Sequence, residues 1–249
     1  MSYNYKESKK RVDDILYSKT EIVKKERIPS SDSEFTYSNG IKSWVGAIFV
    51  DMVGSSDLCK SPDEKTARIF RAFCSEIIAI MKDDSNYRQI GIRGDCVYSI
   101  NTAAYQSDLV DMFETAVLIH TFMKMFRKQL ENKGYEPIRA GIGLGCSEDL
   151  IIKAGQSGSG INDKIWIGKA VVDASKLGDN AYRNGVEPIA MSTLFYDNVH
   201  EILEKQDEGY KTWIKPHREG MYGYYHSSID FYHCDIIRTD FNDWVNNNV

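Results

Sequence analysis

The sequence lacks the features that mark membrane-inserted and secreted proteins. It has no apolar run approaching the roughly 20 residues that a membrane-spanning helix needs, and its first residues, MSYNYKESKKR, contain no apolar signal segment. Its five cysteines are odd in number, scattered and without a CxxC pair. We therefore expect a cytoplasmic protein with reduced thiols, no disulfide framework, no zinc site and no direct insertion into a membrane.

The chain also lacks an excess of positive charge. The chain of 249 residues has a formal net charge of −5, which argues against nucleic-acid binding, since that function requires a basic face. The five histidines show no metal-ligand spacing such as HExxH, and His120 falls in a predicted helix, where a packed core histidine is expected. The length and the ordinary composition fit one domain of roughly 150–200 residues with extensions.

The N-terminal part of the chain combines one helical pattern with a polar segment. Residues 6–27 place apolar side chains at helical spacing with charged residues between them. This pattern predicts one amphipathic helix, packed against the body of the protein or against a dimer partner. A polar linker with turn residues is expected over 29–42, before a first strand from Trp44 to Val50.

Two longer helices are expected in the middle of the chain. Ser61 as the N-cap, Pro62 at the first helical position and Glu64 in a capping box predict the start of the first. The second is expected over 108–132, with Ser107 as its cap.

The remaining apolar segments predict strands. Residues 87–93 and 96–101 are expected to form a hairpin, and 137–145 and 149–155 a second pair of strands. From the first strand to residues 137–145 the elements follow the order βαββαβ, and a further strand and a short helix over 169–179 come after them. This order is typical of a ferredoxin-like α+β fold, in which one antiparallel sheet has helices over one face.

Two carboxylates follow apolar strands in this pattern. Asp51 ends the strand in GAIFVDMVGSS, and Asp95 lies in the turn of GIRGDCVYSI. If these segments lie side by side, the carboxylates meet, and such oxygen ligands suit Mg²⁺ or Mn²⁺ with a nucleoside triphosphate. The small residues Gly54, Ser55 and Ser56 are expected to offer backbone N–H groups to a phosphate.

Strand alternation assigns further side chains to the same region. Phe49 is expected on the face of Asp51, and Gly91 and Arg93 on the face of Asp95. Each aspartate taken alone fits a surface turn better than a functional site. Their combination, each after an apolar strand, makes a functional site and a pair of surface turns equal alternatives.

Four segments resemble the catalytic domain of class III nucleotidyl cyclases. FVDMVGSS is similar to the first metal-binding segment of that family and IRGDCVYSI to the second. RAGIGLG is similar to the strand written RxGIxxG, and WIGKAVVDASKL to the segment written xxGxxVNxAxRL. The resemblance implies an N-terminal helix and linker over 1–43, a cyclase domain over 44–200 and a C-terminal extension over 201–249 that completes the sheet.

The resemblance also implies a mechanism and an assembly. Two ions, Mn²⁺ or Mg²⁺, would be held by Asp51, Asp95 and the backbone carbonyl of Met52, so that the ribose 3′-OH attacks the α-phosphorus and pyrophosphate leaves. Class III cyclases form head-to-tail homodimers with shared sites. One subunit would supply the carboxylates, and the other the WIGKAVVDASKL helix with Lys176.

The chain departs from the purine cyclases at four positions. Their base-reading lysine falls on Gly91 and their second base-reading residue on Ile165. Their ribose-positioning asparagine falls on Val172, which cannot hydrogen-bond, and their phosphate-binding arginine falls on Lys176, which offers a point charge without the arginine fork. Loss of the purine-reading pair indicates either a changed base or a non-catalytic nucleotide-binding domain.

The short chain with GIRGD and WIGKAVVDASKL resembles the bacterial pyrimidine cyclases of the Pycsar anti-phage systems. This resemblance implies that UTP or CTP is the substrate, with UTP favoured, and that the cyclic product acts on a separate effector protein. Arg93 is the candidate contact to the base or to the phosphates, or it is a surface arginine on the sheet. A purine cyclase and a binding domain without turnover are the alternatives.

Overall fold

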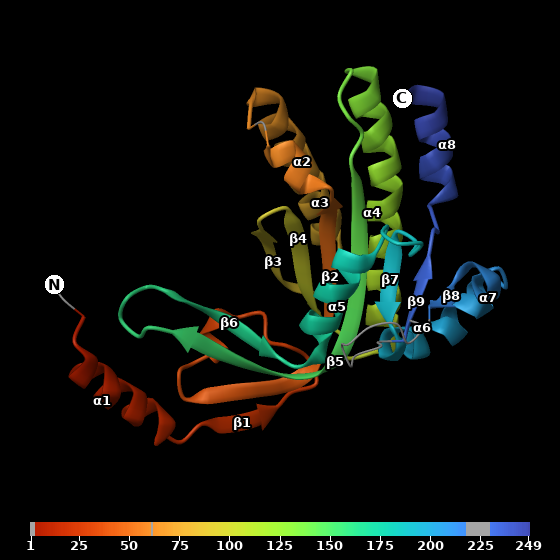
Figure 1. The fold of residues 1–249 in the computed structure, drawn as a ribbon. Helices are drawn as coiled ribbons and strands as arrows, with labels where there is room; N and C mark the ends of the chain where they lie inside the picture. Colours follow the sequence, from red (N-terminus) through yellow and green to blue (C-terminus); the bar gives the residue numbers. More distant parts are fainter. Residues whose placement is uncertain (1–2, 61, 218–229) are drawn as a thin grey trace.

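The computed structural model describes residues 3–60, 62–217 and 230–249, and within them one mixed sheet of nine strands runs through the molecule (Figure 1). The strand order is β3-β4-β2-β5-β7-β9-β8, with β1 beside β2 and β6 beside β5. The strands are Glu21–Lys24 (β1), Asn39–Val53 (β2), Tyr87–Arg93 (β3), Cys96–Thr102 (β4), Arg139–Gly155 (β5), Asn162–Ile167 (β6), Ile189–Ser192 (β7), Lys215–His217 (β8) and Phe231–Cys234 (β9).

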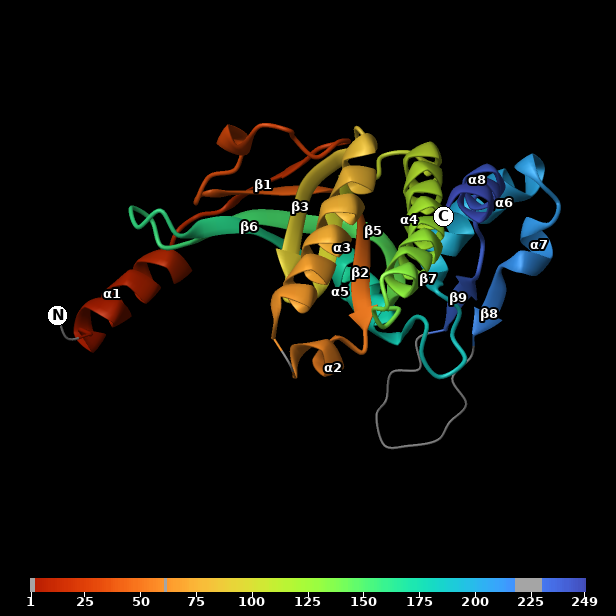
Figure 2. The same ribbon diagram turned by 90° about the horizontal axis from the view of Figure 1, so that it is seen from above.

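Helices cover both faces of this sheet, and not one face as the sequence predicted. They are Tyr5–Leu16 (α1), Ser55–Cys59 (α2), Glu64–Asp83 (α3), Gln106–Asn132 (α4), Lys169–Asn180 (α5), Thr193–Gln206 (α6), Tyr210–Trp213 (α7) and Thr239–Asn248 (α8), with a 3-10 turn at Asp32–Glu34 (η1). Helices α3 and α4 lie side by side on one face (Figure 2). Helix α5 packs on the opposite face, over β2 and β5 (Figure 1).

Strand β2 explains why both faces are covered. Its side chains Ile48 and Val50 join the core beneath α3 and α4. The alternate side chains Ala47 and Phe49 join a second core beneath α5. A strand that is apolar on both sides is typical of a sheet buried on both faces, so the continuous apolar run of GAIFV already carried this signal.

The glycines of RAGIGLG allow α5 to approach β5 closely. A Cβ atom at Gly143 would lie 2.0 Å from the carbonyl oxygen of Ala174. Any side chain at this position would therefore push the helix away from the strand.

The N-terminal helix is shorter than predicted. Helix α1 ends at Leu16, and the next residues form β1, which pairs in parallel with Asn39–Lys42 of β2. The predicted linker over 29–42 therefore contains the start of a strand. Backbone pairing with a distant segment overrode the helical spacing, which is local information only.

Two predicted strands of the middle region are one. Strand β5 is continuous from Arg139 to Gly155 and pairs with β2 along nearly its whole length, so 137–145 and 149–155 do not form a hairpin. Beyond the helices, the ends of β2 and β5 extend with β1 and β6 into an arm, and α1 lies at its far end (Figure 1; Figure 2).

Both predicted caps are displaced. Asp63, and not Ser61, caps α3, and its carboxylate accepts from the Thr66 N–H at 2.7 Å; Ser61 itself lies outside the described residues. Helix α4 begins after Tyr105, whose N–H donates to the Asp108 carboxylate at 2.9 Å, so Ser107 is already helical. Asp and Ser are both good caps, and sequence alone could not choose between neighbours.

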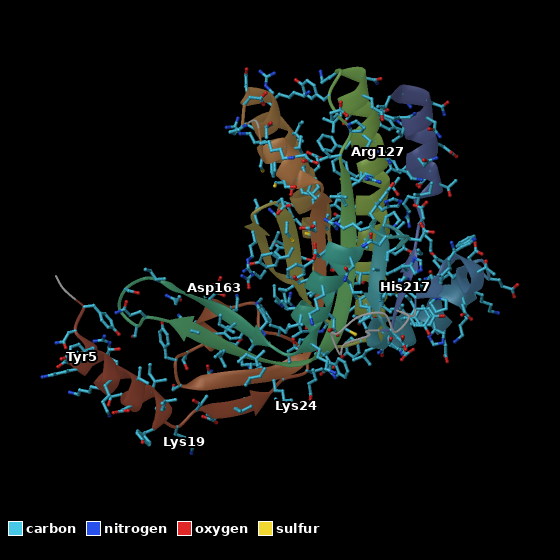
Figure 3. The ribbon with its side chains drawn as sticks, viewed as in Figure 1. Tyr5, Lys19, Lys24, Arg127, Asp163 and His217 are labelled. Atoms are coloured by element: carbon cyan, nitrogen blue, oxygen red, sulfur yellow. The ribbon has the colours of Figure 1, made fainter. Side chains whose placement is uncertain are left out.

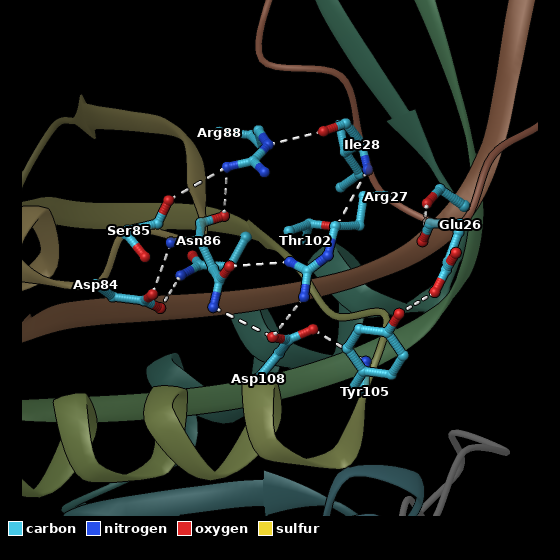
Figure 4. A network of polar contacts seen from close by, with 12 residues as sticks. Glu26, Arg27, Ile28, Asp84, Ser85, Asn86, Arg88, Thr102, Tyr105 and Asp108 are labelled. Atoms are coloured by element: carbon cyan, nitrogen blue, oxygen red, sulfur yellow. Dashed lines mark hydrogen bonds and ion pairs between the residues drawn. The ribbon is translucent and has the colours of Figure 1, made fainter.

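Asp108 also anchors the segment that follows β1 (Figure 4). Its carboxylate accepts from the Arg27 guanidinium at 3.3 Å and from the Asn86 amide at 3.2 Å. Next to Arg27, the Ile28 N–H donates to the Thr102 hydroxyl at 3.1 Å. This network ties the base of the arm to β4 and to the start of α4.

The C-terminal part extends the sheet at β7. Strand β9 pairs antiparallel with β7, and β8 pairs with β9. His120 of α4 is buried, as predicted, and its Nε2 lies 2.5 Å from the Asp235 carboxylate. Most of the aromatic segment over 221–233 lies outside the described residues. No helix among the described residues is long and apolar enough to cross a membrane.

Candidate active site

The two predicted carboxylates lie together at one end of β2 and β4. Asp51 is paired with Cys96, the residue after Asp95, and Asp95 lies in the turn opened by Gly94 at a φ of 64°. Burial raises the pKa of Asp51, and the negative charge of Asp95 adds to that rise. Antiparallel register thus brings together two residues that are far apart in the sequence.

Arg183 lies against one of these carboxylates, Asp51. Its guanidinium donates to the Asp51 carboxylate at 2.7 Å and to the backbone carbonyl oxygen of Met52 at 3.4 Å. Burial raises the pKa of Asp51, the bond from Arg183 opposes that rise, and the charges of Asp95 and Asp179 add to it. Arg183 was not predicted, because it stands in a turn after α5 that carries no recognised motif.

The oxygen atoms of this cluster fit a hard divalent cation. Asp51 and Asp95 supply carboxylates, and the Met52 carbonyl oxygen already accepts from a cation, the Arg183 guanidinium. Such oxygen donors are the ligands that Mg²⁺ and Mn²⁺ prefer. Within the described part of the chain, no group of three or more His, Cys, Asp or Glu side chains has a metal-binding arrangement.

The turn after Asp51 has the predicted small residues in a defined conformation. Gly54 adopts a left-handed φ of 77°, which favours glycine. Ser55 begins the short helix α2, and no side chain caps its first turn. Ser56 is exposed beside it.

A second row of side chains lies on the same face of the sheet. Phe49 of β2, Tyr98 of β4 and Gly91 of β3 are cross-strand neighbours. The rings of Phe49 and Tyr98 stack, with centroids 5.2 Å apart and planes at 14°. Phe49 is therefore mostly covered, and Tyr98, which was not predicted as a site residue, presents the accessible aromatic group.

The other predicted contacts of this region are exposed. Arg93 ends β3 near Asp95. Ile165 of β6 is 45% exposed, while the alternate residue Trp166 points to the sheet and donates from its indole N–H to the Gln89 side-chain oxygen at 2.9 Å. The structure thus assembles Gln89, Tyr98 and Trp166 around Gly91, and leaves Ile165 on the other side of β6.

Helix α5 carries the remaining predicted residues. The Ser147 hydroxyl accepts from the N–H groups of Lys169 and Ala170, at 3.1 and 2.7 Å, and holds the start of the helix. Lys176 is exposed, and within the described residues its charge acts on Asp173, whose pKa burial raises and Lys169 and Lys176 lower. The structure does not bring Lys176 to the Asp51 carboxylate of its own chain.

Comparison with known proteins identifies the family. A uridylate cyclase from Treponema porcinum is 38% identical over 250 residues, which cover 99% of this chain and 82% of that protein. The chain belongs to the uridylate cyclase family. A second member, from Gulbenkiania mobilis, is 28% identical over 258 residues, which cover 99% of this chain and 97% of that protein. No protein-family model matches the sequence.

The fold of this uridylate cyclase family member is that of class III cyclases. The adenylyl cyclase CyaB from P. aeruginosa superposes with a TM-score of 0.63 at 18% identity, over 81% of this chain and 98% of that one. The predicted resemblance to class III nucleotidyl cyclases is confirmed, and so is the α+β cyclase fold.

Proposed function

We propose that the protein converts UTP to 3′,5′-cyclic UMP and pyrophosphate, with CTP as the weaker substrate. Membership of the uridylate cyclase family makes it a pyrimidine nucleotide cyclase. The observation that carries the proposal is the pairing of Asp51 with the Asp95 turn on a class III fold. The glycine at position 91, where purine cyclases carry a lysine, agrees with a changed base.

Asp51, Asp95 and the Met52 carbonyl would hold two divalent ions, Mn²⁺ or Mg²⁺, which would supply charge neutralisation for the triphosphate and acidify the ribose hydroxyl. In the reaction the 3′-oxygen attacks the α-phosphorus in line and forms the new P–O bond. The bond from the α-phosphorus to the bridging oxygen breaks, pyrophosphate leaves with that electron pair, and the hydroxyl proton passes to solvent.

The remaining residues of the chain position the nucleotide. The turn at Gly54, Ser55 and Ser56 offers backbone N–H groups to a phosphate, and Lys176 offers a point charge. Arg93 is exposed at the end of β3 and is suited to a carbonyl or phosphate oxygen. Positioning and charge neutralisation are sufficient for this reaction, so no nucleophilic side chain is required.

The active unit we propose is a head-to-tail homodimer with shared sites. Its support is that, among the described residues of one chain, the groups that act on the Asp51 carboxylate are Arg183, Asp95 and Asp179, and Lys176 of α5 is not among them. We place the enzyme in the cytoplasm, where UTP is present and where its five free cysteines remain reduced. Its product would act on a separate effector in anti-phage defence.

The experiment is incubation of the purified protein with Mn²⁺ and, separately, ATP, GTP, CTP or UTP, with products resolved by mass. Asp51→Ala serves as the control. Cyclic UMP that is absent with the variant supports the proposal. Cyclic AMP or cyclic GMP as the main product, or no cyclic product from any triphosphate, contradicts it.

A further inference from the structure

The geometry points to Tyr98 as the residue that selects uracil over cytosine, with Gln89 and Trp166 as positioning residues that orient its hydroxyl. This inference rests on the proposed function and deepens it, since it concerns the base of the same substrate. It is carried by three observations: the space around Gly91, the direction of the hydrogen bonds and the incomplete burial of Tyr98.

Tyr98 occupies the space that a side chain at position 91 would need. A Cβ atom built on Gly91 would lie 2.5 Å from the Tyr98 hydroxyl oxygen and 2.6 Å from its ring carbon Cζ. The ring is held in place because it stacks on Phe49, with centroids 5.2 Å apart. Gly91 and Tyr98 therefore depend on each other: the absence of a side chain at position 91 makes room for the phenol, at the position where purine cyclases have a lysine.

The hydrogen bonds around Gln89 have a fixed direction. The Trp166 indole N–H is a donor only, and it donates to Gln89 Oε1 at 2.9 Å. This bond settles which end of the Gln89 amide is the oxygen. Its Nε2 therefore faces the other way, and it donates to the Tyr98 hydroxyl oxygen at 3.3 Å and to the Asp163 carboxylate at 3.4 Å. Asp163 stands on β6 of the arm (Figure 3).

The Tyr98 hydroxyl is left with a proton to donate. Its oxygen accepts from Gln89, and among the described residues no acceptor lies within hydrogen-bond distance of it. Burial, and then the charge of Asp163, raise the pKa of Tyr98, so the phenol keeps its proton at neutral pH. Tyr98 is only partly buried, and its face of the sheet is the one that carries the Asp51–Asp95 pair.

A fixed donor distinguishes the two pyrimidines. Position 4 of uracil is a carbonyl oxygen, which accepts, whereas position 4 of cytosine is an amino group, which donates. The Tyr98 O–H satisfies the uracil oxygen and leaves the cytosine amino group facing another donor. A site built to donate to a substrate group discriminates against an analogue that lacks the acceptor, because polar groups then stay unpaired.

The first test is Tyr98→Phe, which keeps the ring and removes the hydroxyl. We expect the ratio of kcat/KM for UTP to kcat/KM for CTP to fall about tenfold, because one buried hydrogen bond is lost for UTP alone. Tyr210→Phe, which changes a partly buried tyrosine in the core beside Phe113, is the matched control and should leave the ratio unchanged.

The second test reverses the direction of the hydrogen bond between residue 89 and the Tyr98 hydroxyl. In the double variant Gln89→Glu with Asp163→Asn, a carboxylate replaces the amide and can only accept, so the Tyr98 O–H turns toward it and presents lone pairs to the base. The preference should then shift toward CTP. A merely structural role of Gln89 would lower both rates without changing their ratio. The control Asp163→Asn alone should keep the preference for UTP.

Failure of the inference about Tyr98 can be distinguished from failure of the proposed function. If the wild-type protein forms cyclic UMP but Tyr98→Phe keeps the wild-type ratio, or the Gln89 variant shows no shift toward CTP, the inference about Tyr98 is wrong and the proposed function stands. If the wild-type protein forms no cyclic pyrimidine nucleotide, the proposed function fails, and the role of Tyr98 fails with it.

Discussion

The Arg183 guanidinium donates to the Asp51 carboxylate at 2.7 Å and contacts the carbonyl oxygen of the next residue, Met52. These are two of the oxygen groups that we propose as metal ligands. On the proposed function, a side-chain cation and a divalent ion would therefore compete for the same carboxylate. Arg183 follows Tyr182, which has a positive φ of 62°, in the turn after α5, so this turn places the guanidinium against the Asp51 carboxylate.

Arg183→Ala should bind Mn²⁺ more tightly than the wild-type protein. The arginine and the carboxylate are both partly buried, and loss of such a pair removes about 1 kcal/mol of competition, which corresponds to about a fivefold lower Kd. Titration calorimetry with Mn²⁺ alone measures this. Arg238→Ala, which breaks a remote pair with Glu114 of the same 2.7 Å length, is the control. An unchanged Kd in Arg183→Ala would show that the Arg183–Asp51 ion pair does not weaken Mn²⁺ binding.

Asp51→Ala and Asp95→Ala should each abolish metal-dependent turnover while the fold persists. Each change removes a hard-cation ligand from the rim of the sheet and leaves the cores beneath α3, α4 and α5 intact. Product formation and thermal unfolding are measured together. Asp57→Ala, at an exposed carboxylate nearby that pairs with Lys60, should retain activity. Turnover that survives either of the first two changes would place the metal elsewhere.

Mixed dimers test whether sites are shared. A chain with Asp51→Ala and a chain with Lys176→Ala should each be inactive alone. Together they should recover up to about a quarter of wild-type activity, because a random mixture forms half heterodimers with one intact site each. Subunit exchange is followed with two differently tagged chains. Exchange without recovery of activity would argue that each site belongs to a single chain.

The buried thiols make the stability fall at alkaline pH. Burial raises the pKa of Cys146 and of Cys234 to about 12 from an ordinary value of 9.0. The folded protein therefore keeps these protons when the unfolded chain loses them, and the free energy of unfolding should decline as pH rises from 9 toward 12. Below pH 8 the two thiols contribute no pH dependence. Thermal unfolding between pH 7 and 11 measures the decline.

The burial of Cys146 and Cys234 also predicts which thiols of the folded protein react with an alkylating reagent. At pH 8 iodoacetamide should modify the exposed Cys59 and leave Cys146 and Cys234 unmodified until the protein unfolds. Mass spectrometry of the labelled chain identifies each modified thiol.

The prediction on alkaline stability has its own control. A Cys146→Ser variant that keeps the full alkaline loss of stability would assign the loss to other groups.

The local sequence was sufficient to predict those elements that are stabilised by residues within their own segment. The Gly94–Asp95 hairpin, the helix over 169–179 and a strand leading to Asp51 were all predicted, because turn chemistry and apolar periodicity are short-range signals. Strand β2, from Asn39 to Val53, is longer at both ends than the predicted strand. The four motifs in order also identified the cyclase fold. The same signals misjudged β1 and the middle of β5, since these depend on pairing with β2 from another part of the chain.

The sequence by itself determined the groups from which the proposed chemistry is argued: two carboxylates after apolar strands, a small-residue turn between them and the absence of a purine-reading lysine. Only the tertiary structure decided which side chains surround them. Arg183 reaches Asp51 from a turn 132 residues away, and Trp166 orients Gln89 from 77 residues away. Such contacts depend on how strands and helices pack in space, and no local pattern of residue types encodes them.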